Sequence, residues 1–195
     1  MYKRQDSIGA KDVPANVYYG VQSLRAAENF PITGLRMNPE LIRSLAYIKK
    51  AAALTNLEAG LLNERIANAI VRACDEILAG KLLEQFIVDP VQGGAGTSTN
   101  MNMNEVIANR ALELGGHPKG DYGFIHPNDD VNHSQSTNDT YPAACKLALI
   151  DAIGPLAEET KKLTRAFHDL ADKHTNDVTL SLIHISEPTR LALIS

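Results

Sequence analysis

The sequence has few cysteines, no long apolar run and no excess of positive charge. Its two cysteines, Cys74 and Cys145, stand far apart and form no C-x-x-C pair, so we expect reduced, buried residues of a cytoplasmic protein rather than a disulfide. No apolar run approaches membrane-spanning length, and the first residues contain no apolar segment typical of a secretory signal. The net charge of −4 gives no reason to expect nucleic acid or an anionic membrane as a partner.

The composition is that of a globular, mainly α-helical chain. Apolar residues make up 44% and charged residues 22% of the 195 residues, which is enough for one domain or somewhat more. The run 86–88 leans towards a β-strand but is too short to support a sheet. Capping residues, glycine stops and apolar spacing predict the helices. They cover residues 21–30, 39–59, 64–78, 97–114, 138–153 and 155–174, with a boundary or kink at Gly154-Pro155.

Apolar residues at helical spacing predict which faces of these helices are buried. The predicted buried positions are Leu41, Leu45, Ile48, Ala52 and Leu57 in the second helix and Ile66, Ile70, Ala73 and Ile77 in the third. In the last helix Leu156, Leu163, Phe167 and Leu170 are expected to face a neighbouring helix of the complete protein, and to form an exposed apolar face in this chain.

A glycine-rich turn leads into the fourth helix. Gly93, Gly94 and Gly96 allow the backbone to adopt positive φ and to approach a ligand closely. Small polar side chains follow at Thr97, Ser98, Thr99, Asn100 and Asn102. Free N–H groups at a helix start favour a carboxylate or phosphate, although ordinary capping uses the same residue types. The spacing matches neither a P-loop nor a dinucleotide-binding fingerprint.

A second stretch, Ser134-Gln135-Ser136-Thr137-Asn138-Asp139-Thr140, again places hydroxyls and amides before a helix, with Pro142 expected in the first turn. Two polar helix starts of this kind could converge on one anion. The sequences GGAGTSTNMNMNEVIANRALE and SQSTNDTYP resemble two conserved blocks of the aspartase/fumarase superfamily. Enzymes of that superfamily eliminate ammonia, water or an amine from a succinyl group and release fumarate.

The resemblance implies a fold and a domain order. It covers nearly all of residues 6–178, and implies a helical N-terminal domain in residues 1–137 and the start of a long-helix-bundle central domain in 138–178. Residues 179–195 change to a strand-like composition and resemble the translation of a sequencing-library adapter. We expect them to be a non-native tail, with a genuine divergent tail as the alternative. The resemblance also implies a homotetramer in the complete enzyme and no cofactor.

By resemblance, Thr97, Ser136, Thr137 and Asn138 bind the substrate carboxylates and amine and stabilise the developing negative charge. They are not the catalytic base, which in the family is a serine on a Gly-Ser-Ser loop that lies beyond this chain. The chain by itself is therefore expected to be inactive.

Three residues indicate a branch of the superfamily. Fumarases tend to carry serine at the position of Ala95, glutamine at that of Ser98 and serine at that of Thr137. These differences favour the aspartase branch, with L-aspartate as substrate and fumarate as product. Fumarate hydratase is the first alternative. The second is a non-catalytic helical module that binds an anion or a partner subunit.

A polar cluster lies at residues 126–133. Its spacing fits no standard metal motif, so we expect no metal. By resemblance to fumarases, which this run favours slightly, His126, Asn128 and Asp129 could form a secondary anion site. A solvated loop that caps the following helix is the alternative.

Overall fold

The computed structural model of the chain describes residues 2–6 and 8–176. The chain divides into two compact units, Met1–Ala152 and Ile153–Ser195. The predicted boundary between residues 137 and 138 stays a prediction, and the predicted tail of residues 179–195 lies outside the described residues.

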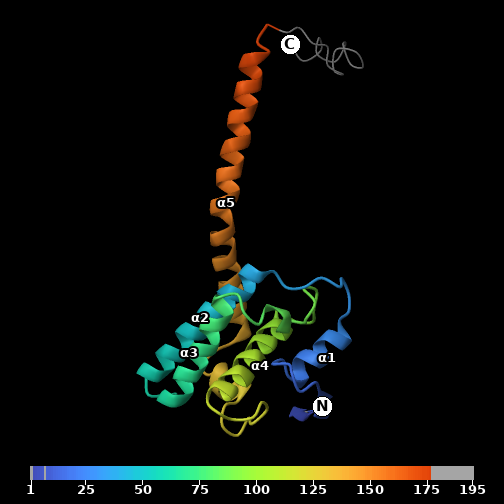
Figure 1. Ribbon diagram of the computed structural model, residues 1–195, viewed down its shortest axis with the longest axis vertical. Coiled ribbons are helices and arrows are strands. Elements are labelled where there is room, and N and C mark those ends of the chain that lie inside the picture. Colours follow the sequence, from blue (N-terminus) through green and yellow to red (C-terminus); the bar gives the residue numbers. More distant parts are fainter. Residues whose placement is uncertain (1, 7, 177–195) are drawn as a thin grey trace. The chain divides into compact units, whose positions relative to one another are not determined.

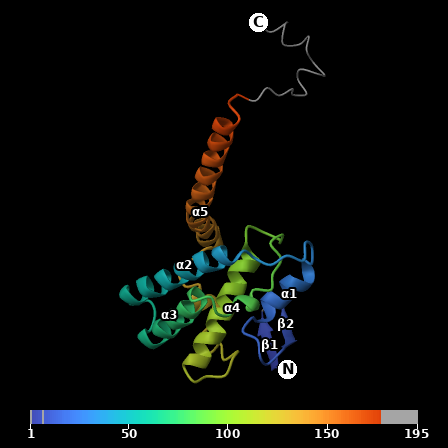
Figure 2. The same cartoon turned by 45° about the horizontal axis from the view of Figure 1, so that its top comes forward.

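The chain begins with a β-hairpin that the sequence analysis did not predict. Strand β1 (Tyr2–Asp6) pairs antiparallel with β2 (Gly9–Val13), so that Tyr2 lies opposite Val13. The hairpin lies beside helix α1 (Figure 2). The run 86–88, the predicted β-leaning segment, forms no strand and instead follows the short 3-10 helix η1 (Leu83–Gln85). Charged side chains in β1 hide its strand character, which comes from backbone pairing with β2 rather than from apolar alternation.

The first four predicted helices are present with nearly the predicted ends. They are α1 (Val21–Asn29), α2 (Pro39–Glu58), α3 (Glu64–Leu78) and α4 (Thr97–Leu114). The side chain of Asn38 accepts from Glu40 N at 2.8 Å, and that of Asn63 accepts from Arg65 N at 2.9 Å, so both predicted asparagine caps are confirmed. Figure 1 shows α2 and α3 side by side with α4 against α3.

The predicted buried face is right for most of α3 and partly wrong for α2. Ile70, Ala73 and Ile77 are fully buried, and Ile66 packs at the edge of the core. In α2, Leu45 is buried as predicted, whereas the other predicted positions are only partly buried. The buried residues of α2 are Ile42, Ser44, Leu45, Ala46, Lys49, Ala53 and Asn56. The buried face of α2 includes a lysine and an asparagine. A prediction from the spacing of apolar residues alone therefore placed the buried face at neighbouring positions of the helix.

The two cysteines are free thiols in different surroundings. Cys74 is fully buried in α3, as predicted. Cys145 is partly exposed, so the prediction of a buried residue is wrong there. Its neighbour Ala144 is fully buried. Because successive residues of a helix point in different directions, Cys145 lies at the margin of the buried face.

Helix α4 is the central element of the first unit, and 12 of its 18 residues are buried. Its carboxylate Glu105 accepts from Gly20 N at 2.8 Å, Gln22 N at 3.0 Å and Ser23 N at 3.0 Å, and from the Ser23 hydroxyl. A negative charge thus meets the free N–H groups at the start of α1. A Cβ on Gly20 would lie 2.4 Å from this carboxylate, so only glycine allows the approach.

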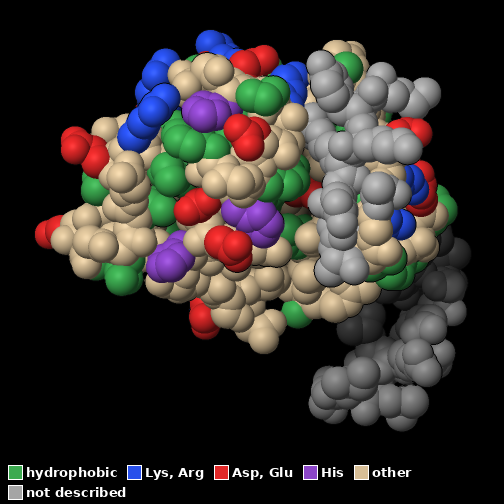
Figure 3. All heavy atoms as spheres, turned by 90° about the horizontal axis from the view of Figure 1, so that it is seen from below, with side chains coloured by type: hydrophobic (Ala, Val, Ile, Leu, Met, Phe, Trp, Pro, Cys, Tyr) green, Lys and Arg blue, Asp and Glu red, His purple; other side chains and the backbone are tan. Residues whose placement is uncertain are grey.

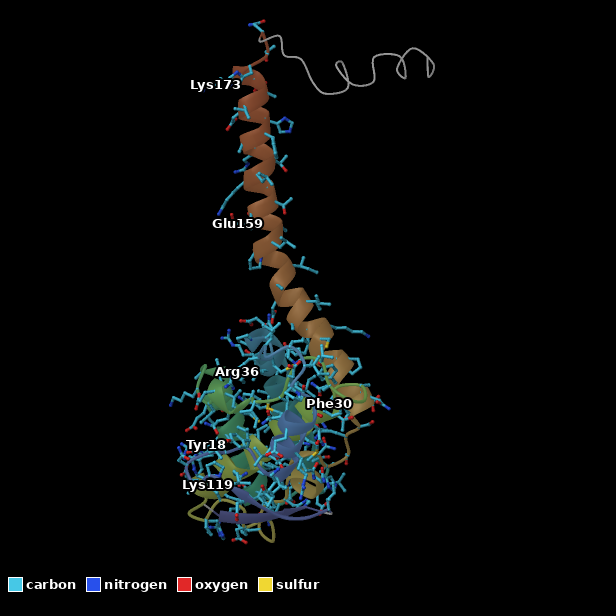
Figure 4. All side chains as sticks on the ribbon, turned by 90° about the vertical axis from the view of Figure 1, so that its right-hand side faces the viewer. Tyr18, Phe30, Arg36, Lys119, Glu159 and Lys173 are labelled. Atoms are coloured by element: carbon cyan, nitrogen blue, oxygen red, sulfur yellow. The ribbon has the colours of Figure 1, made fainter. Side chains whose placement is uncertain are left out.

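The last helix, α5 (Thr137–Lys173), runs without interruption through Gly154-Pro155 (Figure 1). The predicted boundary between two helices is therefore wrong, whereas the alternative, a kink at Gly154-Pro155, stays a prediction. Pro155 lacks the N–H that would bond the Asp151 carbonyl, and its ring crowds that carbonyl. Gly154 has no Cβ, which removes the further clash between a proline ring and the preceding side chain. The described side chains of α5 in the second unit are exposed, including the predicted Leu156, Leu163, Phe167 and Leu170. Figure 4 labels Glu159 and Lys173 on this helix. Within the part of the chain that the structure describes, no helix combines the length and apolar character needed to cross a membrane.

Replacing Glu105 by glutamine tests its role in holding α1 to α4. Burial raises the pKa of Glu105, while its hydrogen bonds act in the opposite direction. The amide would place an NH₂ group among four donors, so Glu105→Gln should lower the free energy of unfolding by about 2–4 kcal/mol. Urea unfolding of the full chain measures the change. Glu58→Gln, at an exposed position, should change stability by less than about 0.5 kcal/mol, and equal losses would contradict the proposed anchor.

Candidate active site

The glycine-rich turn before α4 is shaped by backbone conformation and by close packing. Gly94 and Gly96 have φ of +75° and +84°, in the left-handed region that favours glycine. A Cβ on Gly96 would lie 2.4 Å from the ring of Tyr141, a residue of α5. The turn therefore needs glycine at position 96 for its conformation and for contact with the second motif.

The start of α4 keeps two backbone donors available. The side chain of Gln92 accepts from Thr99 N at 2.8 Å and donates to Thr99 Oγ1 at 2.7 Å. The amide of Thr99, the third residue of the helix, is therefore already bonded. Among the described residues, the amides of Thr97 and Ser98 donate no hydrogen bond. Thr97 is exposed and Ser98 is partly exposed. Two free N–H groups at a helix start form a site suited to an anion.

The start of α5 presents hydroxyl groups whose oxygens already accept protein hydrogen bonds. Ser136 Oγ accepts from Asn138 N at 3.2 Å, and Thr137 Oγ1 accepts from Asn100 Nδ2 at 3.0 Å. Each hydroxyl proton thus remains available as a donor. Pro142 is the sixth residue of α5 rather than a residue of its first turn, so the Asn138 carbonyl lacks its usual helical donor.

The structure brings the two sequence motifs together. The Asn100–Thr137 hydrogen bond and the contact between Gly96 and Tyr141 join the start of α4 to the start of α5. Thr97, Ser136 and Asn138 are exposed and Thr137 is partly exposed, whereas the supporting Asn100 is buried. The result is a set of uncharged donors at two adjoining helix starts, which is suited to binding a carboxylate.

The sequence analysis missed a buried amide network behind these residues. Asn132 Oδ1 accepts from Lys49 Nζ at 2.8 Å, Asn100 Nδ2 at 3.1 Å and Asn104 Nδ2 at 3.2 Å. Burial lowers the pKa of Lys49 to about 7, although the nearby Cys74 acts in the opposite direction. One feature of the sequence could have indicated this network: Lys49 follows the buried Leu45 by four residues and so lies on the same face of the helix.

The predicted secondary anion site is engaged in local hydrogen bonds. Residues 127–131 form a π-helical turn, η2 (Pro127–Val131), where a loop was expected. His126 Nδ1 accepts from Asn128 N and Asp129 N, both at 3.2 Å, so the two amides that would meet an anion cap the turn instead. His126 N donates to Asp130 Oδ2 at 2.6 Å. Histidine and acidic side chains share one face in Figure 3. An anion at His126, Asn128 and Asp129 stays a prediction.

A charged cluster lies elsewhere in the first unit, on α3, α4 and the loops beside them. Arg110 forms ion pairs with Glu76 and Glu113, and the Tyr18 hydroxyl donates to Glu113 at 2.6 Å. Lys119 Nζ lies 3.9 Å from the centre of the Tyr18 ring, and Figure 4 labels both residues. These mutual contacts hold the loop after α4 in place and explain the charges without a ligand.

Comparison with known proteins decides the family. A family profile described as "Lyase" matches residues 9–193 of this chain. The chain belongs to this lyase family. Its predicted membership of the aspartase/fumarase superfamily and its mainly α-helical fold are thereby confirmed.

Several lyases resemble the chain closely. An aspartate ammonia-lyase from Bacillus sp. is 51% identical over 97% of this chain and 40% of the relative. The Bacillus subtilis aspartate ammonia-lyase is 48% identical with the same coverage. The chain thus spans about 40% of the length of these relatives.

Two solved structures share the fold. A fumarate lyase:delta crystallin from Brucella melitensis, bound to cobalt, is 52% identical with a TM-score of 0.85, covering 88% of this chain and 38% of that one. A class II fumarase from Schistosoma mansoni is 39% identical with a TM-score of 0.71, covering 75% of this chain and 31% of that one.

Replacing Gly96 tests the contact that joins the two motifs of this lyase. Gly96→Ala and Gly116→Ala both place a side chain at positive φ, but only the Cβ at position 96 meets another residue. We expect Gly96→Ala to destabilise the full chain by about 1–3 kcal/mol more than Gly116→Ala, because Tyr141 must move. Denaturant unfolding gives the difference. Equal losses would show that Tyr141 does not depend on the glycine.

Proposed function

We propose that the protein containing this chain is an aspartate ammonia-lyase, which eliminates ammonia from L-aspartate and releases fumarate. The observation that carries the proposal is the donor arrangement at Ser136 and Thr137. Both hydroxyl oxygens accept a protein N–H, which leaves their protons for a ligand oxygen beside the free amides of Thr97 and Ser98. The relatives at 48–51% identity that carry this name support the choice of substrate.

The proposed reaction proceeds in two steps. A base removes a proton from Cβ of aspartate, and the electron pair moves into the neighbouring carboxylate to give a dianionic aci-carboxylate. Collapse of this intermediate forms the C=C bond and breaks the Cα–N bond, so that ammonia leaves. Thr97, Ser136, Thr137 and Asn138 would bind the carboxylates and amine and stabilise the extra negative charge. Hydroxyls and amides suit this role because they donate without titrating. By resemblance, the base is a serine outside this chain.

Fumarate hydration is a second candidate, favoured by the likeness to the class II fumarase. The same donors would then serve malate, with hydroxide as the leaving group. Ala95, Ser98 and Thr137 instead favour the deaminating branch. A non-catalytic module that binds an anion or a partner subunit is the alternative of another class. For the complete protein we propose a homotetramer, which the exposed apolar residues of α5 support.

A chimera tests the substrate. Residues 1–178 of the chain replace the matching part of the Bacillus subtilis relative, and fumarate and ammonia are followed with aspartate and with malate. We expect aspartate turnover, with malate slower by at least about tenfold, a difference of about 1.4 kcal/mol in the barrier. The variant Ala95→Ser/Ser98→Gln/Thr137→Ser should reduce this preference. Faster turnover of malate would replace the proposal by the hydratase, and an inactive chimera beside an active parent would favour the non-catalytic module.

Two substitutions in the chimera test the placement of the site. Thr97→Ala and Asn138→Ala should each lower kcat/KM for aspartate by roughly 10- to 1000-fold, the effect of losing one donor to the developing charge. His126→Ala should lower it much less, because its ring caps a local turn. Steady-state kinetics on the three variants gives the order. If His126→Ala were the most damaging change, the main site would lie at the 126–133 cluster.

A further inference from the structure

Lys49 is a buried lysine whose amino group is held by two side-chain amide oxygens. Its side chain on α2 is 0% exposed. Its Nζ donates to Asn132 Oδ1 at 2.8 Å and to Gln135 Oε1 at 2.9 Å. Within residues 2–6 and 8–176, no carboxylate lies at ion-pair distance from it. A fully buried, unpaired lysine is rare because desolvation of the charge is costly. Its two acceptors therefore need an explanation beyond packing.

The first acceptor connects Lys49 to the candidate active site. Asn132 Oδ1 accepts hydrogen bonds from Lys49 Nζ and from Asn100 Nδ2. Asn100 Nδ2 also donates to Thr137 Oγ1. These contacts form a continuous path from α2 through the 132 side chain to α4 and then to the first residue of α5. The position of Asn132 therefore sets where Asn100 meets the Thr137 hydroxyl.

The second acceptor controls the backbone just before α5. Gln135 Nε2 donates to the carbonyls of Val131 at 3.0 Å and His133 at 3.2 Å, and Asn56 Nδ2 also donates to the His133 carbonyl at 3.0 Å. Between these residues, Ser134 has φ of +58°, which a serine seldom adopts. A strained residue of this kind persists only where its neighbours hold it. Lys49 fixes the oxygen of Gln135 and so holds this turn.

We propose that Lys49 is a positioning residue, which through Asn132 and Gln135 sets the direction of the Thr137 hydroxyl that meets the substrate. The role of Thr137 as a substrate ligand rests on the proposed function. The coupling between Lys49 and Asn100 follows from the hydrogen bonds alone.

The charge of Lys49 provides the means to detect this coupling. Burial lowers its pKa to about 7, so the group loses its proton near neutral pH. Its charge-assisted hydrogen bonds then weaken, which changes the surroundings of Asn100. From α3 the titratable group is Cys74, whose pKa burial raises to about 12. On α2 itself, Lys50 pairs with Asp75. In the loop, Gln135 bonds the backbone of the titratable residue His133, and α4 presents the amides of Asn100 and Asn104.

The test is a pH titration of the full chain by NMR, with labelled lysine ε-carbons and asparagine side-chain amides. We expect the Lys49 signal and the Asn100 amide signals to share a midpoint near pH 7. Lys49→Met should abolish the shift of Asn100. Lys50→Met, on the neighbouring exposed lysine, and His133→Gln should preserve it.

Each outcome decides the proposal. If Asn100 does not respond while Lys49 titrates, or if its response disappears with His133→Gln, the positioning role is wrong. The titration of the unmodified chain gives this answer even if Lys49→Met fails to fold. No turnover is measured, so loss of the lyase assignment would leave the coupling result unchanged, and the two proposals fail separately.

Discussion

The first unit depends on satisfying the polar side chains that α4 carries into the core. Buried amides and carboxylates are costly unless each finds a partner. Most of these side chains bind segments outside the helix, so this single helix organises the connections around it. Asn104 shares Asn132 with Asn100, and among the described residues its own Oδ1 has no hydrogen-bond partner. Thr99 binds Gln92, Asn100 binds Thr137, Asn102 binds the backbone of Gln85 and Ile87, Glu105 binds the start of α1, and Asn109 binds Tyr18 O and Gly120 N.

This arrangement divides the glycine-rich turn and the helix that follows it, residues 93–109, into two parts with different roles. Residues 93–98 form the exposed turn and helix start that can meet a ligand. From Thr99 to Asn109, the polar side chains are buried and tie loops to α4. A block rich in asparagine suggests a binding surface when only its composition is considered. The structure shows that these asparagines are buried: Asn100 and Asn104 bind Asn132 behind the candidate site, whereas Asn102 and Asn109 hold other loops to α4.

Local signals predicted the helices well, because caps and glycine stops act within a few residues. Asn38 and Asn63 cap α2 and α3 as their sequence positions indicate. Apolar spacing misplaced the buried face of α2, since Lys49 and Asn56 are core residues whose partners lie more than 70 positions away. The hairpin was missed for a different reason: its two strands are neighbours in sequence, but the charged residues of β1 give no apolar alternation, and the strand depends on backbone pairing with β2. The substrate-binding candidates came from family resemblance, whereas their supporting network depends on long-range contacts that no local pattern encodes.

In the candidate site, the charged group and the groups exposed to a ligand are different residues. The groups that we propose to meet a ligand, at Thr97, Ser136, Thr137 and Asn138, are uncharged and keep the same donors across the physiological pH range. The titrating group, Lys49, lies behind them and reaches Thr137 only through Asn132 and Asn100. Direct contact with an ammonium would bind a dicarboxylate tightly before and during the reaction alike, which does not lower the barrier. Neutral donors aimed by a rigid buried network can instead favour the state with the greater negative charge, because they are already oriented when that charge develops.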